Sequence, residues 1–191
     1  MTGLDSFATA TAMLHALRDR EISAVELLEM HLTQIARHNP ALNAIVIPDY
    51  DNARRAAAEA DAARARGDDA PLLGLPYTLK DSINAAGLRS TAGAPVFAEY
   101  RATEDAPLTA RARAAGGVLM GKTNVPPFLG DWQSDNAIFG RTNNPWDTAR
   151  TPGGSTGGGA AALAAGMTPL EFGSDIGDTE MLARVVSGTA R

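Results

Sequence analysis

Hydrophobic residues in the first part of the chain recur at intervals of three and four positions, the spacing of one face of an α-helix. The pattern predicts one helix within residues 7–20 and a second over residues 24–37. Ser23 and Glu26 stand three positions apart at the start of the second helix and have the form of a capping box. Asn39-Pro40 is expected to end this helix.

Short apolar runs alternate with further helical patterns along the rest of the chain. Such alternation is typical of α/β proteins, so we expect an α/β sandwich around a largely parallel sheet. Residues 126–152 hold many turn residues and two tryptophans, Trp132 and Trp146, which favour a long but ordered surface excursion. The expected strands cover residues 44–47, 75–79, 117–120 and 170–172, and the expected helices cover residues 52–66, 107–115 and 160–165.

The amino-acid composition argues against several kinds of binding site and several kinds of partner. The net charge of −5 comes without a basic run, which argues against nucleic-acid binding. No apolar run approaches the roughly 20 residues of a membrane-spanning helix, and the N-terminal pattern is not that of a secretory signal. The absence of cysteine excludes disulfides, cysteine nucleophiles and thiolate metal sites. We therefore expect a cytoplasmic protein with no metal, no cofactor and no nucleic-acid or membrane partner.

The most informative polar segment is the glycine-rich stretch 151–159, which contains Ser155. Residues 153–157 formally match G-x-S-x-G, the turn that presents the nucleophile of α/β-hydrolases. Residues 143–150 do not form the apolar strand that this turn requires, and all three histidines precede Ser155 in the chain. A Ser-Asp-His triad in the hydrolase order is therefore excluded within this chain. A flexible glycine turn before a helix is the competing interpretation.

A serine without histidine needs another base, and lysine is the other attested partner. The chain has only two lysines, and its 15 arginines stay protonated in proteins. Lys80 follows the expected buried strand 75–79, where burial would favour the neutral amine that a base requires. Lys122 competes for the same role, although it follows a glycine and precedes a polar turn. A lysine at a strand end that merely pairs with Asp81 is the competing interpretation of Lys80.

Several linked segments, in the same order, resemble the amidase signature family over most of residues 20–178. The resemblance implies a mixed, largely parallel sheet in an α/β/α sandwich, and hydrolysis of a carboxylic amide to acid and amine or ammonia. It further implies a Ser-cisSer-Lys triad, with Lys80 as the base and Ser155 as the bridging serine on a cis peptide bond. The segments are residues 74–81 (GLPYTLKD), 121–126 (GKTNVP), 139–146 (FGRTNNPW), 151–166 and 169–177.

The resemblance places Thr179 at the position of the nucleophile, which is serine in the family. The oxyanion-binding backbone N–H groups would be those of Ile176, Gly177, Asp178 and Thr179. Threonine keeps a hydroxyl but stiffens χ1, and Asp178 brings a carboxylate beside the developing negative charge. Met181 replaces the arginine of the family pattern. We therefore expect the chain alone to be a poor or inactive amidase.

Two other functions are weighed against amide hydrolysis. One is a Ser-Lys esterase in which Ser155 itself is the nucleophile, and the other is a catalytically inactive amidase-like fragment. The partner is expected to be a small-molecule amide, and an incomplete sheet with an exposed edge and an uncovered apolar face favours a homo-oligomer. We expect one truncated domain, incomplete at its C-terminus, with a helical region at 1–70, a core at 71–179 and a divergent tail at 180–191.

Overall fold

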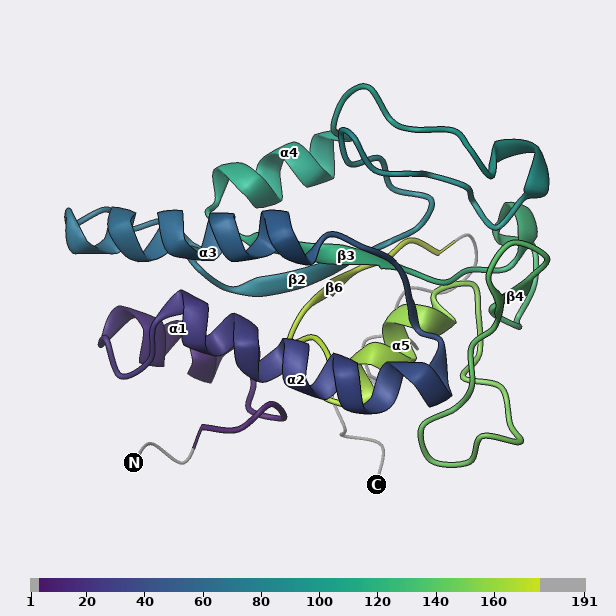
Figure 1. Cartoon of the computed structure of the whole chain (residues 1–191), viewed down its shortest axis with the longest axis horizontal. Coiled ribbons are helices and arrows are strands. Elements are labelled where there is room, and N and C mark those ends of the chain that lie inside the picture. The colour runs from purple at the N-terminus through teal and green to yellow at the C-terminus, as the bar shows by residue number, and fades with distance from the viewer. Residues whose placement is uncertain (1–3, 176–191) are drawn as a thin grey trace.

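Four strands form one sheet at the centre of the chain: β1 (Ile45–Pro48), β2 (Pro76–Lys80), β3 (Val118–Thr123) and β6 (Glu171–Phe172) (Figure 1). The structure is a computed structural model, which describes residues 4–175. The strand order is β1-β3-β2-β6. β2 is parallel to both β3 and β6, whereas β1 is antiparallel to β3. The expected mixed, largely parallel sheet is confirmed.

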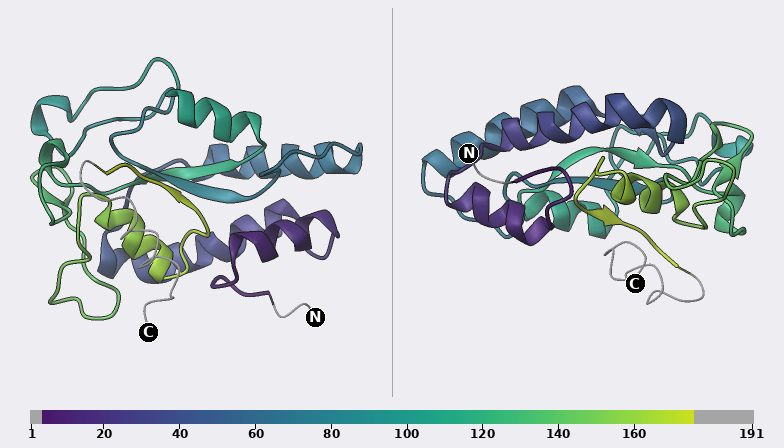
Figure 2. Two further views of the ribbon diagram at one scale, coloured as in Figure 1. Left: turned by 180° about the vertical axis from the view of Figure 1, so that it is seen from behind. Right: turned by 90° about the horizontal axis from the view of Figure 1, so that it is seen from below.

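Within residues 4–175, the α-helices that pack around this sheet are α1 (Ala10–Arg18), α2 (Ala24–Leu42), α3 (Tyr50–Ala65), α4 (Pro107–Ala114) and α5 (Gly157–Ala164). Alternate residues of β3 belong to different hydrophobic clusters. Val118 and Met120 pack with apolar residues of α1, α2, α3 and α5, whereas Leu119 packs with Ala112 of α4. Helices therefore cover both sheet faces, with α2 and α3 side by side and α4 on the opposite face (Figure 2).

Most of the expected elements agree with the structure to within a few residues. The capping box at the start of α2 is confirmed, because Ser23 Oγ accepts from the Glu26 N–H while the Glu26 carboxylate accepts from the Ser23 N–H. α5 begins earlier than expected, at Gly157, inside the glycine-rich stretch. No helix in the described part of the chain combines the length and the apolar character that crossing a membrane requires.

Pro40 does not end α2, so the expected boundary at Asn39-Pro40 is wrong. The helix continues to Leu42 and is closed by Asn43, a left-handed residue at φ 50° whose N–H donates to the Asn39 carbonyl. Pro40 lies in the last turn, where its missing N–H removes one hydrogen bond at an exposed position. The Asn39 side chain instead ties the end of the helix to the sheet, because its Nδ2 donates to the Ile45 carbonyl of β1 at 2.9 Å.

β3 is longer than expected, and its extra residues place Lys122 inside the sheet rather than before a polar turn. The strand bulges near Gly121, where a Cβ would come within 2.5 Å of the Ile47 carbonyl oxygen on β1. After the bulge, Lys122 pairs in register with Leu79 of β2 and shares its sheet face. Lys80 follows Leu79 and therefore points to the opposite face.

The excursion over residues 126–152 is held by amide side chains rather than by its tryptophans. Trp132 and Trp146 are 71% and 85% exposed, so they cannot anchor it by burial. The buried Asn136 side chain donates to Asn124 Oδ1 at 2.7 Å, and Asn124 Nδ2 donates to a backbone carbonyl of the excursion at 2.9 Å. The excursion contains a 3₁₀ turn, η2 (Pro127–Leu129), and a two-stranded ribbon, β4 (Asp135–Asn136) with β5 (Gly140–Arg141).

His31 on α2 is a buried histidine that should make the stability of the fold depend on pH. Its side chain is fully buried, with Nδ1 at 3.0 Å from the Gly166 carbonyl. Its Nε2 has no hydrogen-bond partner among the described residues. Burial lowers the pKa of His31 below its ordinary value of 6.5, and the hydrogen bond to Gly166 opposes that shift only in part. The folded state therefore holds His31 neutral where the unfolded chain would already bind a proton.

We expect the contribution of His31 to stability to be fully present above pH 6.5 and to be lost as the pH falls through the folded-state pKa. The slope should reach about 1.4 kcal/mol per pH unit for this single proton. Urea unfolding followed by circular dichroism across this window measures it, and His31→Leu should flatten the curve. His15→Gln, at an exposed position on α1, is the matched control. Equal slopes in His31→Leu and the unmodified chain would contradict the assignment.

Candidate active site

Lys80 and Ser155 meet across the interface between the sheet and α5. Lys80 is the last residue of β2, and Ser155 lies two residues before α5. Lys80 Nζ donates to Ser155 Oγ at 2.7 Å and to the Ser174 carbonyl oxygen at 2.5 Å. The Lys80 side chain is fully buried and Ser155 is 6% exposed. The two residues that the sequence selected for a Ser-Lys arrangement are therefore in direct contact.

The backbone around Ser155 has an unusual local geometry. The peptide bond between Gly154 and Ser155 is cis, which is the geometry that the family resemblance implies for a bridging serine. The next residue, Thr156, donates from Oγ1 to the Ser174 carbonyl oxygen at 3.2 Å. The same carbonyl also accepts from Lys80, so one backbone oxygen ties the segment after β6 to both β2 and the start of α5.

The glycines at the start of α5 serve close packing, which corrects the interpretation of a flexible turn. A Cβ at positions 157, 158 and 159 would come within 2.5 Å of Ser134 Oγ, the Asn124 backbone nitrogen and Glu171 Cγ, respectively. All three positions are buried. Because only glycine lets a backbone approach so closely, the first turn of α5 is fixed against the excursion, the residue that follows β3, and β6.

Burial lowers the pKa of Lys80 from 10.5 to about 8, while the carboxylates of Asp175 and Glu171 oppose this shift. As an ammonium, Lys80 donates to Ser155 in the contact described above. As a neutral amine, the same nitrogen can accept the proton of the Ser155 hydroxyl. The one contact therefore allows Lys80 both to take a proton from Ser155 and to return it. A substantial fraction of neutral amine near pH 8 makes this lysine a usable general base.

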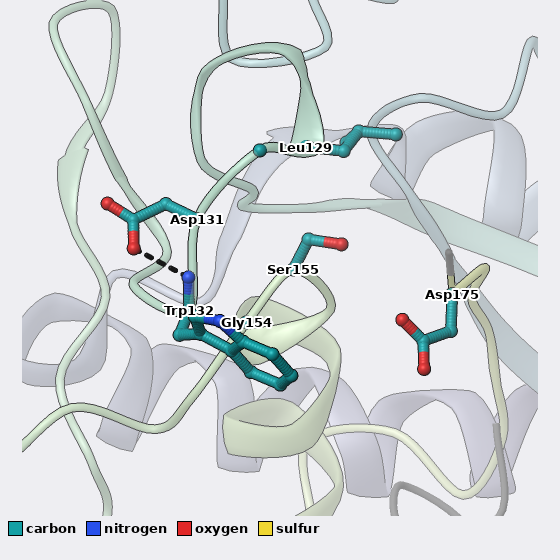
Figure 3. Close-up of a pocket in the computed structure, with 7 residues that line it drawn as sticks. Leu129, Asp131, Trp132, Gly154, Ser155 and Asp175 are labelled. Atoms are coloured by element: carbon teal, nitrogen blue, oxygen red, sulfur yellow. Dashed lines mark hydrogen bonds between the residues drawn. The ribbon is translucent and has the colours of Figure 1, made fainter. Parts of the chain in front are cut away.

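Ser155 faces an open pocket of about 210 Å³. In Figure 3, Ser155 lies between Leu129 and Trp132, with Asp175 across the pocket. The main chain around Leu129 is left-handed, with φ 53° at Phe128 and 62° at Leu129. The remaining lining residues are Gly130, Asp131 and Gly154. The pocket therefore offers a hydroxyl beside a buried base, apolar walls and the carboxylate of Asp175, whereas the Asp131 carboxylate is turned away and accepts from the Trp132 N–H (Figure 3).

Lys122 lies on the other sheet face and belongs to a separate buried network. Its Nζ contacts Asp81 Oδ1 at 3.1 Å and donates to the carbonyl oxygens of Asp81 at 2.8 Å and Arg89 at 2.7 Å. It also donates to Ser90 Oγ. The Asp81 carboxylate accepts in addition from the N–H and hydroxyl of Thr91. Asp81 is thus the partner of Lys122, and the competing interpretation that pairs Lys80 with Asp81 is wrong.

Four of the residues selected from the sequence, Ile176, Gly177, Asp178 and Thr179, lie outside the described residues. Glu171 and the Ser174 carbonyl were not expected from the sequence, yet both contribute to the surroundings of Lys80. A glutamate inside the short expected strand 170–172 was a usable signal, because a charged residue in a covered strand needs a partner. Among residues 4–175 no group of three or more His, Asp or Glu side chains could hold a metal ion.

Comparison with known proteins gives consistent matches. Residues 26–179 match the model of the family described as Amidase. One subunit of the glutamyl-tRNA(Gln) amidotransferase of Roseiflexus castenholzii is 43% identical over 177 residues, which are 93% of this chain and 36% of that protein. The corresponding protein of Azoarcus sp. is 42% identical over 170 residues, 89% of this chain and 35% of that protein.

Solved structures show the same similarity in three dimensions. The 6-aminohexanoate cyclic dimer hydrolase superposes with a TM-score of 0.80 at 37% identity, over 89% of this chain and 34% of that one. A bacterial aryl acylamidase of the amidase signature enzymes superposes with a TM-score of 0.82 at 29% identity, over 86% of this chain and 35% of that one. The chain therefore spans about a third of the length of the proteins it matches.

Proposed function

Since this chain belongs to the amidase signature family, we propose that it carries the base and the bridging serine of a site that cleaves carboxylic amides. The family assignment made from the sequence is confirmed. The observation that carries the proposal is the 2.7 Å contact between the buried Lys80 Nζ and the Oγ of Ser155, a residue that faces a pocket.

The proposed reaction is a proton relay followed by acyl transfer. Neutral Lys80 takes the proton of the Ser155 hydroxyl, and Ser155 takes the proton of the nucleophilic hydroxyl, which we assign to Thr179. The Thr179 oxygen attacks the amide carbon, and backbone N–H groups of residues 176–179 stabilise the oxyanion, where each donor is worth about 2.7–4 kcal/mol. The relay then runs in reverse and protonates the leaving nitrogen as the C–N bond breaks. Water hydrolyses the resulting ester and restores the Thr179 hydroxyl.

Support for the substrate class comes from the solved relatives. They include a cyclic dimer hydrolase, an aryl acylamidase and a peptide amidase of Stenotrophomonas maltophilia. We propose a small carboxylic amide as the substrate of this site. The pocket around Ser155 supports this choice, because Leu129 and Trp132 give it apolar walls.

A second candidate is release of the amide nitrogen to another acceptor instead of to water. The sequence relatives that favour it are parts of an amidotransferase, at 43% identity. Both candidates use the same C–N cleavage and the same Lys80-Ser155 contact. They differ in the fate of the nitrogen, which a coupled assay for free ammonia distinguishes.

A third candidate is the Ser-Lys esterase, in which Ser155 attacks the substrate directly. It is favoured by the fact that Ser155 Oγ both faces the pocket and contacts Lys80. Covalent labelling separates it from the amidase mechanism, because the two place the reactive oxygen on different residues.

We expect a fluorophosphonate probe to label Thr179 in the folded chain only slowly, because the stiff χ1 of threonine and the neighbouring Asp178 carboxylate impair the nucleophile. Trypsin releases residues 151–184 as one peptide that holds both Ser155 and Thr179, so the sample also needs cleavage after Glu171 before mass spectrometry. The fragment that begins at residue 172 also contains Ser174, so fragment-ion sequencing must locate the label on it. Label on Thr179 supports the amidase mechanism, and label on Ser155 supports the esterase. If a sample that circular dichroism shows to be folded takes up no label, the result supports the interpretation of the chain as an inactive amidase-like fragment. Urea-unfolded chain is the control for non-specific reaction.

A further inference from the structure

Glu171 on β6 is a carboxylate held from two sides by the central strands of the sheet. Its Oε1 accepts from Thr123 Oγ1 of β3 at 2.6 Å, and its Oε2 accepts from Thr78 Oγ1 of β2. Both carboxylate oxygens thus accept from hydroxyl groups, one on the adjacent strand β2 and one on β3, the strand beyond it. Two threonines that converge on one carboxylate fix its position far better than a single surface contact would.

The sheet register places this carboxylate on the same face as Lys80. Glu171 is the register partner of Thr78, and Lys80 is the register partner of Thr123. Thr78 and Lys80 are two residues apart on β2, a separation of about 6.6 Å along a strand. The two hydroxyls that hold Glu171 therefore flank Lys80, one along its own strand and one across to β3.

The other side of Glu171 is covered by the first turn of α5. A Cβ at Gly159 would come within 2.5 Å of Glu171 Cγ, so the helix backbone rests on the glutamate side chain. This turn begins two residues after Ser155. Glu171 therefore lies between the strand that carries the base and the helix that follows the serine.

Two carboxylates act on Lys80, first that of Asp175, which follows β6 and lines the pocket, and then that of Glu171. α5 has no titratable side chain, because its sequence is GGGAAALA. The carboxylate of Asp81 belongs to the opposite sheet face, where it pairs with Lys122. Glu171 is the one of these groups that is fixed by two hydroxyls and packed under the helix.

We propose that Glu171 is a positioning residue for the base: its carboxylate, held by Thr78 and Thr123, sets the spacing between β2 and α5 and adds a fixed negative charge that favours the ammonium form of Lys80. The inference rests on the proposed function only in taking Lys80 as the base. The inference adds Glu171 to the residues that set the position and the protonation of Lys80 before proton transfer to and from Ser155.

The charge on Glu171 is available at the pH where Lys80 titrates. Burial raises the pKa of Glu171 to about 7, against the hydrogen bonds from Thr123 and Thr78 and the charge of Lys80. The pKa of Lys80 is about 8, a pH at which Glu171 is mostly ionised. Removing the charge while keeping the shape should therefore favour the neutral amine and lower the pKa of Lys80. Glu171→Gln makes that change, since an amide keeps the size and an oxygen acceptor.

The chain itself allows a direct measurement, because Lys80 and Lys122 are its only lysines. The full chain labelled with ¹³C at lysine Cε should give two lysine signals in a ¹H–¹³C spectrum, and Lys80→Met assigns them. In Glu171→Gln the midpoint of the Lys80 signal should move to lower pH by about 0.5 or more, a threefold change in the ratio of amine to ammonium. The Lys122 signal should not follow it.

Glu59→Gln is the matched control, because Glu59 is exposed on α3. It should leave the Lys80 midpoint unchanged. A folded Glu171→Gln chain with an unchanged Lys80 midpoint would overturn the proposal. If Glu171→Gln does not fold, Thr123→Val replaces it, because losing that hydroxyl weakens the ionised form of Glu171 and should move the Lys80 midpoint in the same direction.

The titration also distinguishes a failure of the Glu171 proposal from a failure of the proposed amide cleavage. It reads the protonation of Lys80 without any substrate, so a chain that cleaves no amide still gives a result for Glu171. Conversely, amide cleavage together with an unmoved Lys80 midpoint in Glu171→Gln would refute the role of Glu171 and leave the proposed function standing.

Discussion

Replacing Lys80 with methionine should lower the rate of probe labelling and of amide cleavage by about 10²–10⁴-fold, the usual contribution of a general base. The methionine side chain is similar in length and suits the buried site, but it cannot accept the proton of Ser155. The contact between Lys80 Nζ and Ser155 Oγ is the first link of the relay, so its loss removes both proton transfers. Labelling kinetics with a fluorophosphonate and turnover of an aryl amide measure the effect.

Two variants sharpen this test. Lys80→Arg keeps a positive charge but offers no base, so it should be as slow as the methionine variant. Arg111→Met removes an exposed cation on α4 and should keep the full rate. A Lys80→Met chain that reacts within tenfold of the unmodified chain would show that another group acts as the base.

Replacing Lys122 with methionine should lower the free energy of unfolding by about 3–5 kcal/mol, because it leaves the buried charge of Asp81 without its partner. Both side chains of this pair are fully buried. The variant would also lose the donor to the carbonyl oxygens of Asp81 and Arg89, which hold the loop after β2. Urea unfolding monitored by circular dichroism measures the change.

The paired variant Lys122→Met with Asp81→Asn separates the lost charge from the lost packing. It should be more stable than Lys122→Met alone, because the remaining side chain no longer carries an unpaired charge. A single Lys122→Met chain within about 1 kcal/mol of the unmodified chain would contradict the buried ion pair as a stabilising element. The lost stability is a large part of the roughly 5–15 kcal/mol that holds a typical domain together.

The absence of a histidine after Ser155 and the presence of only two lysines made Ser155, Lys80 and Lys122 candidates. The resemblance to the amidase signature family, rather than elimination, then assigned Lys80 as the base and Ser155 as the bridging serine. The roles of Thr179 and of residues 176–178 remain predictions, as do the cytoplasmic location, the homo-oligomer, the absence of cofactors and nucleic-acid partners, and the division at residues 70 and 179.

The features that the sequence did not reveal depend on contacts between distant segments. The side to which Lys122 points is set by the bulge near Gly121, a residue that β1 approaches too closely to leave room for a Cβ. The pairing of Lys122 with Asp81 joins residues 41 positions apart. Asn39-Pro40 predicts a helix end, yet α2 continues to Leu42 and Asn43 supplies a left-handed cap beyond it. Local propensity carries no information about such partners.

The glycine-rich stretch shows the same limit. Composition alone favoured flexibility, whereas the close approaches at positions 157–159 show that these residues are small because other groups occupy the space. The approach of Gly159 to Glu171 is the most informative of these contacts, because it connects a residue without a side chain to the charge beside Lys80.

The burial of both lysines has a consequence for the surface chemistry of this molecule. Lys80 and Lys122 are each fully buried, and every other cationic side chain at neutral pH is an arginine. Acylating dyes, amine-reactive cross-linkers and acetylating enzymes therefore meet no lysine ammonium on the folded protein, apart from what the α-amino group offers. Incorporation of such a reagent into either lysine would report the opening of the sheet itself.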